Sequence, residues 1–277
     1  MLKEQIKIHE NFGSTYLNHP RNVLVYLPPN YGVNPLQRFP VLYMQDGQNL
    51  MNPEDAFGGI AWGVDETAQQ LILANEIEPL IIVGIYNTGV KRTDEYTPVK
   101  SNVGRMKGHG GKADFYGRMI IEELKPFIDE KYLTKPEREF TGLGGSSLGG
   151  LVSLYLGYKR PDVFSRLAVM SPSVWWANNQ IIREIAANPE RIPLRIWLDI
   201  GKREGGRIKH QVRALKEILL ANGWQQGADL AYLEVPGAGH EEAAWAARFD
   251  QVLRFLFPRM EFPVLDSGQN YLLERTA

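Results

Sequence analysis

Two hydrophobic patterns alternate along this chain. Several short runs are almost continuously apolar, which is typical of strands that are covered on both faces of a sheet. These runs lie at residues 22–27, 40–44, 80–86, 167–170, 194–200 and 230–235. Between them, apolar residues recur every three or four positions, which is the repeat of one helix face. Strands that alternate with helices predict an α/β fold, with a mostly parallel central sheet flanked by helices on both faces.

Two of the predicted helices end at a recognisable signal. The apolar stripe of residues 207–222 consists of Ile208, Val212, Leu215 and Leu219, and Gly223 follows as a C-terminal cap. The stripe of residues 242–257 consists of Trp245, Phe249, Leu253 and Leu256, and Pro258 ends that helix.

Residues 88–112 show no hydrophobic period and are rich in Gly, Lys and Arg. A loop this long inside a compact domain is usually a lid or binding loop, or else a solvated excursion. We favour a loop on the substrate side. We also expect a single domain over residues 1–277, because this length is near the upper limit of one hydrophobic core.

Composition narrows the class of protein. Hydrophobic residues make up 44% of the chain and charged residues 23%, which is ordinary for a soluble globular protein. A formal net charge of -1 argues against nucleic-acid or membrane binding through bulk charge. The absence of cysteine excludes disulfides, thiolate metal sites and a cysteine nucleophile. No signal-peptide core and no run of about 18 apolar residues is present, so we expect a cytoplasmic protein, although a chain trimmed of its signal would look the same.

The most informative motif is Gly145-Ser-Ser-Leu-Gly149, a G-x-S-x-G sequence. The run before it, residues 138–144, has the pattern of a short buried strand. The apolar face of the helix predicted after it consists of Leu148, Leu151, Val152, Tyr155 and Leu156. Strand, sharp turn and helix form the context of a serine nucleophile, and the strained turn requires small residues two positions to either side. This register selects Ser147, because counting from Ser146 places Leu148 where the second glycine belongs. The alternative is a glycine-rich turn that carries serines by chance.

A serine nucleophile needs a histidine base, and His210 and His240 are the histidines that follow Ser147. His210 lies on the polar side of a predicted helix, where a solvated histidine is expected. His240 follows the strand at 230–235 through a Pro-Gly-Ala-Gly turn, at the carboxyl edge where sites of open α/β sheets gather. We predict that His240 is the base.

Two carboxylates compete for the role of the acid that orients the histidine. Asp199 lies inside the strand at 194–200, where a carboxylate more often caps a turn or pairs with a cation. Glu204 lies on the loop after that strand, with glycines on both sides that let the backbone bend toward a partner. We favour Glu204 over Asp199.

The developing oxyanion requires two backbone N–H donors. One is expected from Leu148, the residue after the nucleophile, at the start of a helix. The second is expected from the loop after the early strand at 40–44, where Gln48 follows a glycine. The Gly-His-Gly-Gly sequence at 108–111 is similar to an oxyanion motif of lipases, but it follows no predicted strand.

Other chemistry is not indicated by the sequence. His240-Glu-Glu-Ala-Ala lacks the second histidine of a zinc-binding helix. Gly110-Gly-Lys has no glycine at the P-loop spacing, and the glycines around Ser147 do not match the dinucleotide fingerprint. We therefore expect no metal, nucleotide or flavin cofactor.

Over residues 21–257 the chain resembles the esterase D and enterochelin-esterase-like family of α/β-hydrolases, which also includes feruloyl and acetyl-xylan esterases. The matching pieces are Val41-Leu-Tyr-Met-Gln-Asp-Gly-Gln-Asn, Glu95-Tyr-Thr-Pro, Glu122-Glu-Leu-Lys-Pro-Phe-Ile-Asp, Gly144-Gly-Ser-Ser-Leu-Gly-Gly, Ser171-Pro-Ser-Val-Trp-Trp, Gly201-Lys-Arg-Glu and Gly237-Ala-Gly-His. The resemblance implies the α/β-hydrolase fold and the same roles for Ser147, His240, Leu148 and Gln48. The family's acid falls at Glu204, where many relatives have aspartate.

Candidate substrate-binding residues come from two places. Trp175 and Trp176 follow a predicted strand at the edge of the site, where they could wall an acyl or aromatic pocket or only cap the core. Arg92 and Tyr96 lie in the 88–112 loop. Its cations are Lys91, Arg92, Lys100, Arg105, Lys107 and Lys112, against Asp94 and Glu95. This excess suggests the hypothesis that the loop attracts anionic or polyhydroxylated esters.

The leading interpretation is a serine carboxylesterase that acts on short-chain or aryl esters of small molecules through an acyl-enzyme. An acyltransferase that uses the same acyl-enzyme is the nearest alternative, and a non-catalytic binding protein of the same fold is another. The tail at 258–277 carries Phe262, Val264, Leu265, Tyr271 and Leu272, which could pack on the body or on a second subunit of a homo-oligomer.

Overall fold

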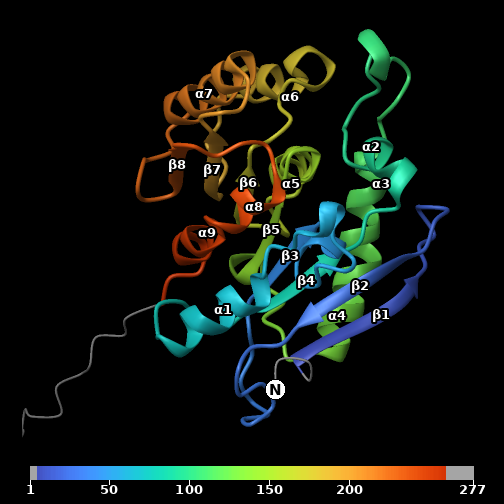
Figure 1. The fold of residues 1–277 in the computed structure, drawn as a ribbon, viewed down its shortest axis with the longest axis vertical. Helices are drawn as coiled ribbons and strands as arrows, with labels where there is room; N and C mark the ends of the chain where they lie inside the picture. Colours follow the sequence, from blue (N-terminus) through green and yellow to red (C-terminus); the bar gives the residue numbers. More distant parts are fainter. Residues whose placement is uncertain (1–4, 260–277) are drawn as a thin grey trace, which may run out of the picture.

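The computed structural model describes residues 5–259, in which eight strands form one sheet with the order β1-β2-β4-β3-β5-β6-β7-β8 (Figure 1). The strands are β1 (Ile6–Phe12), β2 (Arg21–Tyr26), β3 (Val41–Gln45), β4 (Ile81–Ile85), β5 (Thr141–Ser146), β6 (Arg166–Met170), β7 (Arg195–Gly201) and β8 (Leu230–Val235). From β4 to β8 all neighbours pair in parallel, whereas β1 and β2 pair antiparallel. Each apolar run predicted as a strand forms one, and the mostly parallel sheet is confirmed.

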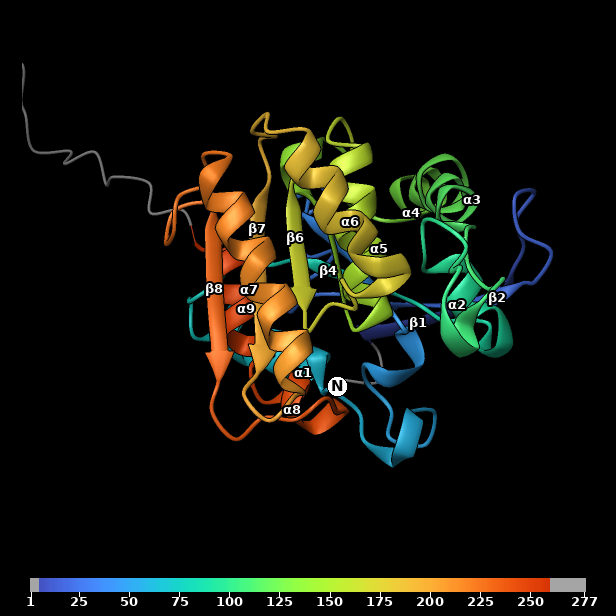
Figure 2. The same ribbon diagram turned by 90° about the horizontal axis from the view of Figure 1, so that it is seen from above.

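Helices cover both faces of this sheet (Figure 2). They are α1 (Val64–Leu73), α2 (Arg92–Glu95), α3 (Ala113–Arg118), α4 (Lys125–Lys131), α5 (Leu148–Lys159), α6 (Trp176–Ala187), α7 (Gly206–Ala221), α8 (Glu242–Ala246) and α9 (Phe249–Leu256). A π-helical segment, Met119–Leu124, joins α3 to α4. One buried cluster packs α3 to α7 against the sheet, and a second packs α1, α8 and α9 against the opposite face.

Strand β3 shows why the central runs are continuously apolar. Val41 and Tyr43 belong to the first cluster, whereas Leu42 and Met44 belong to the second. Successive side chains of a strand point to opposite faces, so a strand covered on both sides needs an apolar residue at every position.

The structure differs from the predicted elements at three places. The helix predicted over 242–257 is two helices, α8 and α9, because the chain breaks at Arg248, whose side chain is 1% exposed. The run at 138–144 begins with a 3-10 turn, Arg138–Phe140, and becomes strand β5 only at Thr141. The hydrophobic pattern does not predict β1, an edge strand with several exposed positions.

The 88–112 segment also contains local structure that its sequence does not predict. Besides α2, it forms 3-10 turns at Gly89–Lys91 and Gly104–Met106, and an isolated bridge joins Lys100 to Gly110. Within residues 5–259 no helix is long and apolar enough to cross a membrane. The apolar residues noted in the tail, Phe262 to Leu272, lie outside the described residues.

Candidate active site

Ser147 lies at the sharp turn between β5 and α5. Its backbone has φ 58° and ψ -120°, a conformation that residues other than glycine rarely adopt. A Cβ on Gly145 or on Gly149 would lie 2.9 Å from the Cβ of Gln45. The two glycines are therefore required by close packing against β3. The turn presents Ser147 at the carboxyl edge of the parallel strands, whereas Ser146 is the last residue of β5 and is buried.

A chain of hydrogen bonds joins Ser147, His240 and Glu204. His240 Nε2 lies 2.9 Å from Ser147 Oγ, and His240 Nδ1 lies 2.7 Å from Glu204 Oε2. The three residues follow β5, β8 and β7, whose carboxyl ends meet at the same edge of the parallel sheet and bring them together. The His240 side chain is 40% exposed and that of Glu204 only 1%. Such an arrangement can activate a hydroxyl, because the imidazole can accept its proton while a buried carboxylate orients the ring.

Glu204 is held as a carboxylate by three donors. Burial pushes its pKa upward, but hydrogen bonds from His240, from the Ser171 hydroxyl and from the Gly201 N–H outweigh burial and keep the pKa below its ordinary value of 4.5. The Ser171 Oγ to Glu204 Oε1 distance is 2.6 Å, and that from Gly201 N is 2.8 Å. Neutral and basic pH therefore leave this carboxylate charged beside the imidazole.

Asp199, the alternative acid, binds other partners. Its Oδ2 accepts the indole N–H of Trp197 at 2.7 Å, and its Oδ1 accepts Arg248 Nη2 at 2.8 Å and the Ser171 N–H at 3.1 Å. Asp199 is fully buried. It therefore pairs with a cation inside the sheet, while the carboxylate that contacts His240 is Glu204.

The two amides proposed as oxyanion donors stand at the ends of neighbouring strands. Leu148 is the first residue of α5, where helical N–H groups have no acceptor within the helix. Gln48 lies in the 3-10 turn Gly47–Asn49 that follows β3. Neither amide donates a hydrogen bond to another residue within 5–259. Both groups are thus free to bind a substrate oxygen.

An ion pair braces the turn that carries Gln48. Arg92 Nε lies 2.7 Å from Asp46 Oδ1 and Arg92 Nη2 lies 2.7 Å from Oδ2, while Asn87 Nδ2 lies 2.8 Å from Oδ1. The backbone N–H of Asp46 donates to the Tyr96 hydroxyl at 3.2 Å. The side chain of Gln48 in turn accepts the N–H of Asn87 at 3.2 Å. Contacts from Arg92, Asn87 and Tyr96 therefore hold the loop after β3 in place.

A cavity of about 560 Å³ opens over the serine and the histidine. Its apolar wall includes Phe57, Ile60 and Trp245. Phe57 and Ile60 are exposed, at 80% and 47%, whereas Trp245 is buried and packs edge-on against the His240 ring at 4.9 Å. The charged residues of the wall are Asp46, Arg92, Glu241 and Glu242. Carboxylates therefore outnumber the cation, whose guanidinium already pairs with Asp46.

Glu242 is held by two hydrogen bonds. Its Oε1 accepts Asn49 Nδ2 at 3.1 Å, and its Oε2 accepts the indole N–H of Trp62. Burial raises its pKa, and the nearby Asp46 charge raises it further, although the Trp62 hydrogen bond and the Arg92 charge act against this. Glu242 is not recognisable from the sequence as a cavity residue, because only the fold brings the start of α8 close to Ser147.

The remaining predicted residues do not line this cavity. Tyr96 is fully buried beneath Asp46, and Trp176 is 2% exposed with its indole N–H bonded to Val99 O at 2.8 Å. Trp175 is 38% exposed but lies outside the cavity lining. His210 and His109, the histidine of the discounted lipase-like sequence, are exposed away from the site. Of the four substrate-binding residues expected from the sequence, Arg92 alone reaches the described cavity.

A second serine lies beside the first. Ser173 is buried, its Oγ is 3.2 Å from Ser147 Oγ, and its N–H donates to the Ser147 carbonyl at 2.9 Å. It belongs to the Ser171-Pro-Ser-Val-Trp-Trp segment, in which the sequence indicated a candidate role for the two tryptophans but none for this serine. The loop after β6 therefore buttresses the elbow.

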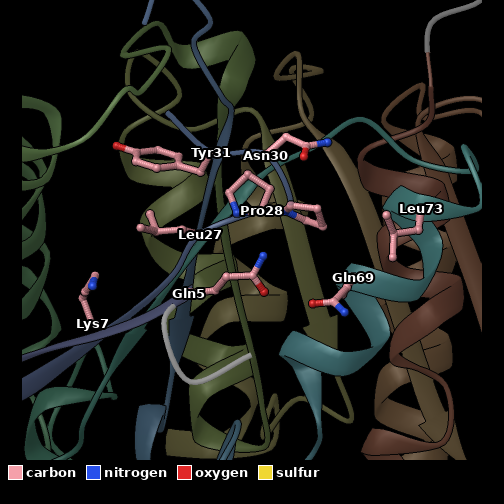
Figure 3. A pocket seen from close by; sticks show the side chains of 9 residues that line it. Gln5, Lys7, Leu27, Pro28, Asn30, Tyr31, Gln69 and Leu73 are labelled. Atoms are coloured by element: carbon pink, nitrogen blue, oxygen red, sulfur yellow. The ribbon is translucent and has the colours of Figure 1, made fainter. Parts of the chain in front are cut away.

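Figure 3 shows the side chains that line another cavity, away from Ser147. It has a volume of about 730 Å³ and is lined by Gln5, Lys7, Leu27, Pro28, Pro29, Asn30, Tyr31, Gln69 and Leu73. Leu27 follows the antiparallel β2, so this cavity is near the amino ends of the parallel strands. Its wall contains no serine, histidine or carboxylate. Residues 5–259 contain no group of three or more His, Asp or Glu side chains placed to hold a metal ion.

The chain is similar to several known proteins. Uncharacterized protein YbbA of Bacillus subtilis is 27% identical over 86% of this chain and 92% of its own length. Ferri-bacillibactin esterase BesA of the same species is 27% identical over 80% of this chain and 81% of its own. The solved structure of a ferulic acid esterase superposes with a TM-score of 0.67, at 18% identity, over 91% of this chain and 97% of that one.

The fold is that of the α/β-hydrolases, and Ser147 stands at the sharp strand–turn–helix junction within hydrogen-bonding distance of His240. Residues 14–256 match the esterase family described as "Putative esterase". The chain belongs to this family.

Proposed function

We propose that this protein is a serine carboxylesterase that hydrolyses short-chain or aryl esters through an acyl-enzyme. The observation that carries the proposal is the unbroken hydrogen-bonded chain from Ser147 Oγ through His240 to Glu204, at 2.9 and 2.7 Å. Membership of an esterase family supports the same reaction class. The relative that is a ferri-bacillibactin esterase supports ester hydrolysis, and the structural neighbour that is a ferulic acid esterase fits an aryl substrate.

Each proposed role follows from these contacts. Ser147 Oγ attacks the ester carbonyl carbon while His240 Nε2 accepts the hydroxyl proton, and Glu204 stabilises the imidazolium. The N–H groups of Leu148 and Gln48 bind the oxyanion, and each such donor contributes on the order of 10²–10³-fold in rate. The intermediate then collapses, the alcohol leaves with the proton from His240, and the acyl group stays on Ser147. Water attacks this ester by the same route and releases the acid.

The cavity favours an ester that carries no negative charge. Asp46, Glu241 and Glu242 face it, whereas Arg92 is neutralised by two contacts to Asp46. The exposed side chains of Phe57 and Ile60 add apolar surface to the cavity wall. We therefore propose neutral aryl or alkyl esters as substrates, in place of the anionic esters that the loop cations suggest from sequence alone.

The reaction is tested by Ser147→Ala with p-nitrophenyl acetate. We expect kcat to fall by roughly 10³-fold or more, with unchanged circular dichroism, because the other groups cannot replace the nucleophile. Ser146→Ala is the matched control and should keep more than half of the activity. Near-wild-type hydrolysis by Ser147→Ala would refute the assignment. Release of free acid, rather than acyl transfer to added alcohols, distinguishes the esterase from an acyltransferase.

The charge preference is tested with two esters that share a leaving group. At pH 8, kcat/KM for p-nitrophenyl acetate should exceed that for the anionic p-nitrophenyl hemisuccinate by about tenfold, equivalent to ~1.4 kcal/mol. Glu242→Gln should narrow this ratio, and Glu76→Gln, an exposed carboxylate outside the cavity, should leave it unchanged. A preference for the hemisuccinate would overturn the argument and restore the loop cations as its determinant.

A further inference from the structure

A buried set of polar side chains lies behind Glu204 and is not used by the reaction steps above. It consists of Ser171, Asp199, Trp245 and Arg248, none of which is more than 4% exposed. Ser171 follows β6, Asp199 belongs to β7, and Trp245 and Arg248 come from the region of α8 and α9. The cluster therefore ties two strand ends to the C-terminal helices at the back of the site.

The hydrogen bonds of Ser171 fix the direction of its proton. Its Oγ accepts the indole N–H of Trp245 at 3.1 Å and Arg248 Nη2 at 2.9 Å. A hydroxyl has two acceptor positions and a single proton, so with both positions occupied that proton must be donated elsewhere. The remaining neighbour is Glu204 Oε1, at 2.6 Å. Ser171 is thus a donor to the carboxylate whose other oxygen faces His240.

Charge explains why an arginine stands at this point. Two carboxylates, Asp199 and Glu204, are buried at the end of the same strand, and unpaired buried charges are costly. Arg248 Nη2 donates to Asp199 Oδ1 at 2.8 Å and to Ser171 Oγ at 2.9 Å, so the positive charge lies between Asp199 and the hydroxyl that contacts Glu204. Arg248 Nη1 is anchored by the Ala244 carbonyl at 2.6 Å. The strand carboxylate that is not the proposed acid therefore holds the cation that orients Ser171.

We propose that Ser171 is a positioning residue for Glu204, held in place by Arg248, Trp245 and Asp199, and that it keeps the carboxylate aligned with His240. The backbone supports this role, since Ser171 has φ 39°, a strained value for a residue with a side chain. Trp245 links His240 to Ser171, because its indole packs against the His240 ring and donates a hydrogen bond to Ser171 Oγ. This inference rests on the proposed esterase function.

The test is Ser171→Ala, with Ser165→Ala as the matched control. Both hydroxyls are buried and flank β6, but Ser165 donates to the Arg138 carbonyl at 2.7 Å, at the far end of that strand. We expect Ser171→Ala to lower kcat by roughly 10–100-fold with KM within twofold, since a misplacement near 1 Å can cost about 10²-fold. Ser165→Ala should lower Tm to a similar extent and leave kcat unchanged.

The pH profile separates positioning from a loss of stability. With one donor fewer, the Glu204 carboxylate is more basic and holds the imidazolium proton more firmly, so the acid limb of kcat/KM should move to higher pH. If Ser171→Ala does not fold, Ser171→Gly removes the same hydroxyl and suits the positive φ. An unmoved acid limb, a kcat within twofold of wild type, or an equal loss in Ser165→Ala would overturn the inference.

A p-nitrophenyl phosphonate distinguishes this failure from failure of the proposed function. If the wild-type protein is not labelled at Ser147, the esterase assignment itself is wrong. If the wild-type protein and Ser171→Ala are labelled at the same rate, the assignment stands and the positioning role is refuted. We expect labelling of both, with Ser171→Ala slower by a factor similar to its loss of kcat.

Discussion

Gly47→Ala is a direct test of how the loop after β3 serves the site. Gly47 precedes Gln48, the proposed second oxyanion donor, and packs against β4. A Cβ at this position would lie 2.5 Å from the carbonyl carbon of Gly84 and 2.7 Å from the Ile85 nitrogen. These are backbone atoms of a central strand that is paired on both sides with β2 and β3. The strand cannot yield, so the loop must move.

The size of the movement follows from the contact distances. Ordinary van der Waals contact begins near 3.4 Å, so the new carbon must retreat by about 0.9 Å from the Gly84 carbonyl carbon. Overpacking of this kind costs about 1–3 kcal/mol of stability, which lowers Tm by roughly 2–10 °C for a chain of this size. A shift near 1 Å, or the loss of one oxyanion donor, lowers the rate by on the order of 10²-fold.

The assay is kcat for p-nitrophenyl acetate together with Tm by circular dichroism. Gly13→Ala is the control, because a Cβ there meets nothing within 4 Å and the residue has no positive φ. We expect a kcat loss of about 10²-fold for Gly47→Ala and none for Gly13→Ala. A folded Gly47→Ala protein with kcat within threefold of wild type would show that the Gln48 amide contributes little.

Two predictions concern stability. The pKa of Glu204 lies below its ordinary value of 4.5, because the hydrogen bonds that it accepts outweigh burial. Its contribution to the free energy of unfolding is therefore present above about pH 4.5 and is lost as pH falls through the lower pKa of the folded state. Between pH 6 and pH 3 the urea midpoint should therefore fall more steeply for the wild-type protein than for Glu204→Gln, and parallel curves would contradict this. Glu95→Gln removes the charge of a carboxylate that contacts Arg21 at 2.9 and 3.1 Å, with side chains only 1% and 2% exposed, and should cost about 3–5 kcal/mol in urea unfolding. Glu76→Gln, in an exposed pair with Arg254, should lower the free energy of unfolding by at most about 0.5 kcal/mol. Equal losses of stability in Glu95→Gln and Glu76→Gln would show that burial does not decide how much an ion pair contributes.

Elements whose environment is uniform could be predicted from sequence. A central strand such as β3 is apolar at every position because both of its faces are covered, and that signal is local. Edge strand β1 has no such signal, since Lys7, Ile8 and Glu10 are exposed and only its pairing with β2 defines it. The break between α8 and α9 also escapes periodicity. Arg248 turns inward there to reach Asp199, a partner 49 residues away.

The same distinction applies to the candidate site. Ser147 and His240 could be placed because each follows a strand end through a turn rich in glycine, and strand ends of a parallel sheet meet at one edge. Tyr96 and Trp176 could not be placed, because an aromatic residue suits a pocket wall and a core equally well. Both are covered in the folded chain, where Tyr96 supports the backbone of Asp46 and Trp176 bonds to Val99.

The two carboxylates at the end of β7 show why choosing the acid from sequence required an argument about position. Asp199 and Glu204 have similar side-chain chemistry, and both are buried within bonding distance of Ser171. Strand geometry separates them, since Asp199 is fixed within the sheet while Glu204, on the loop beyond Gly201, can turn back toward the end of β8. A carboxylate that stays in the strand can neutralise Arg248, and Arg248 then orients the hydroxyl that holds the other carboxylate. In the proposed mechanism, Asp199, the residue rejected as the acid, therefore helps to position Glu204.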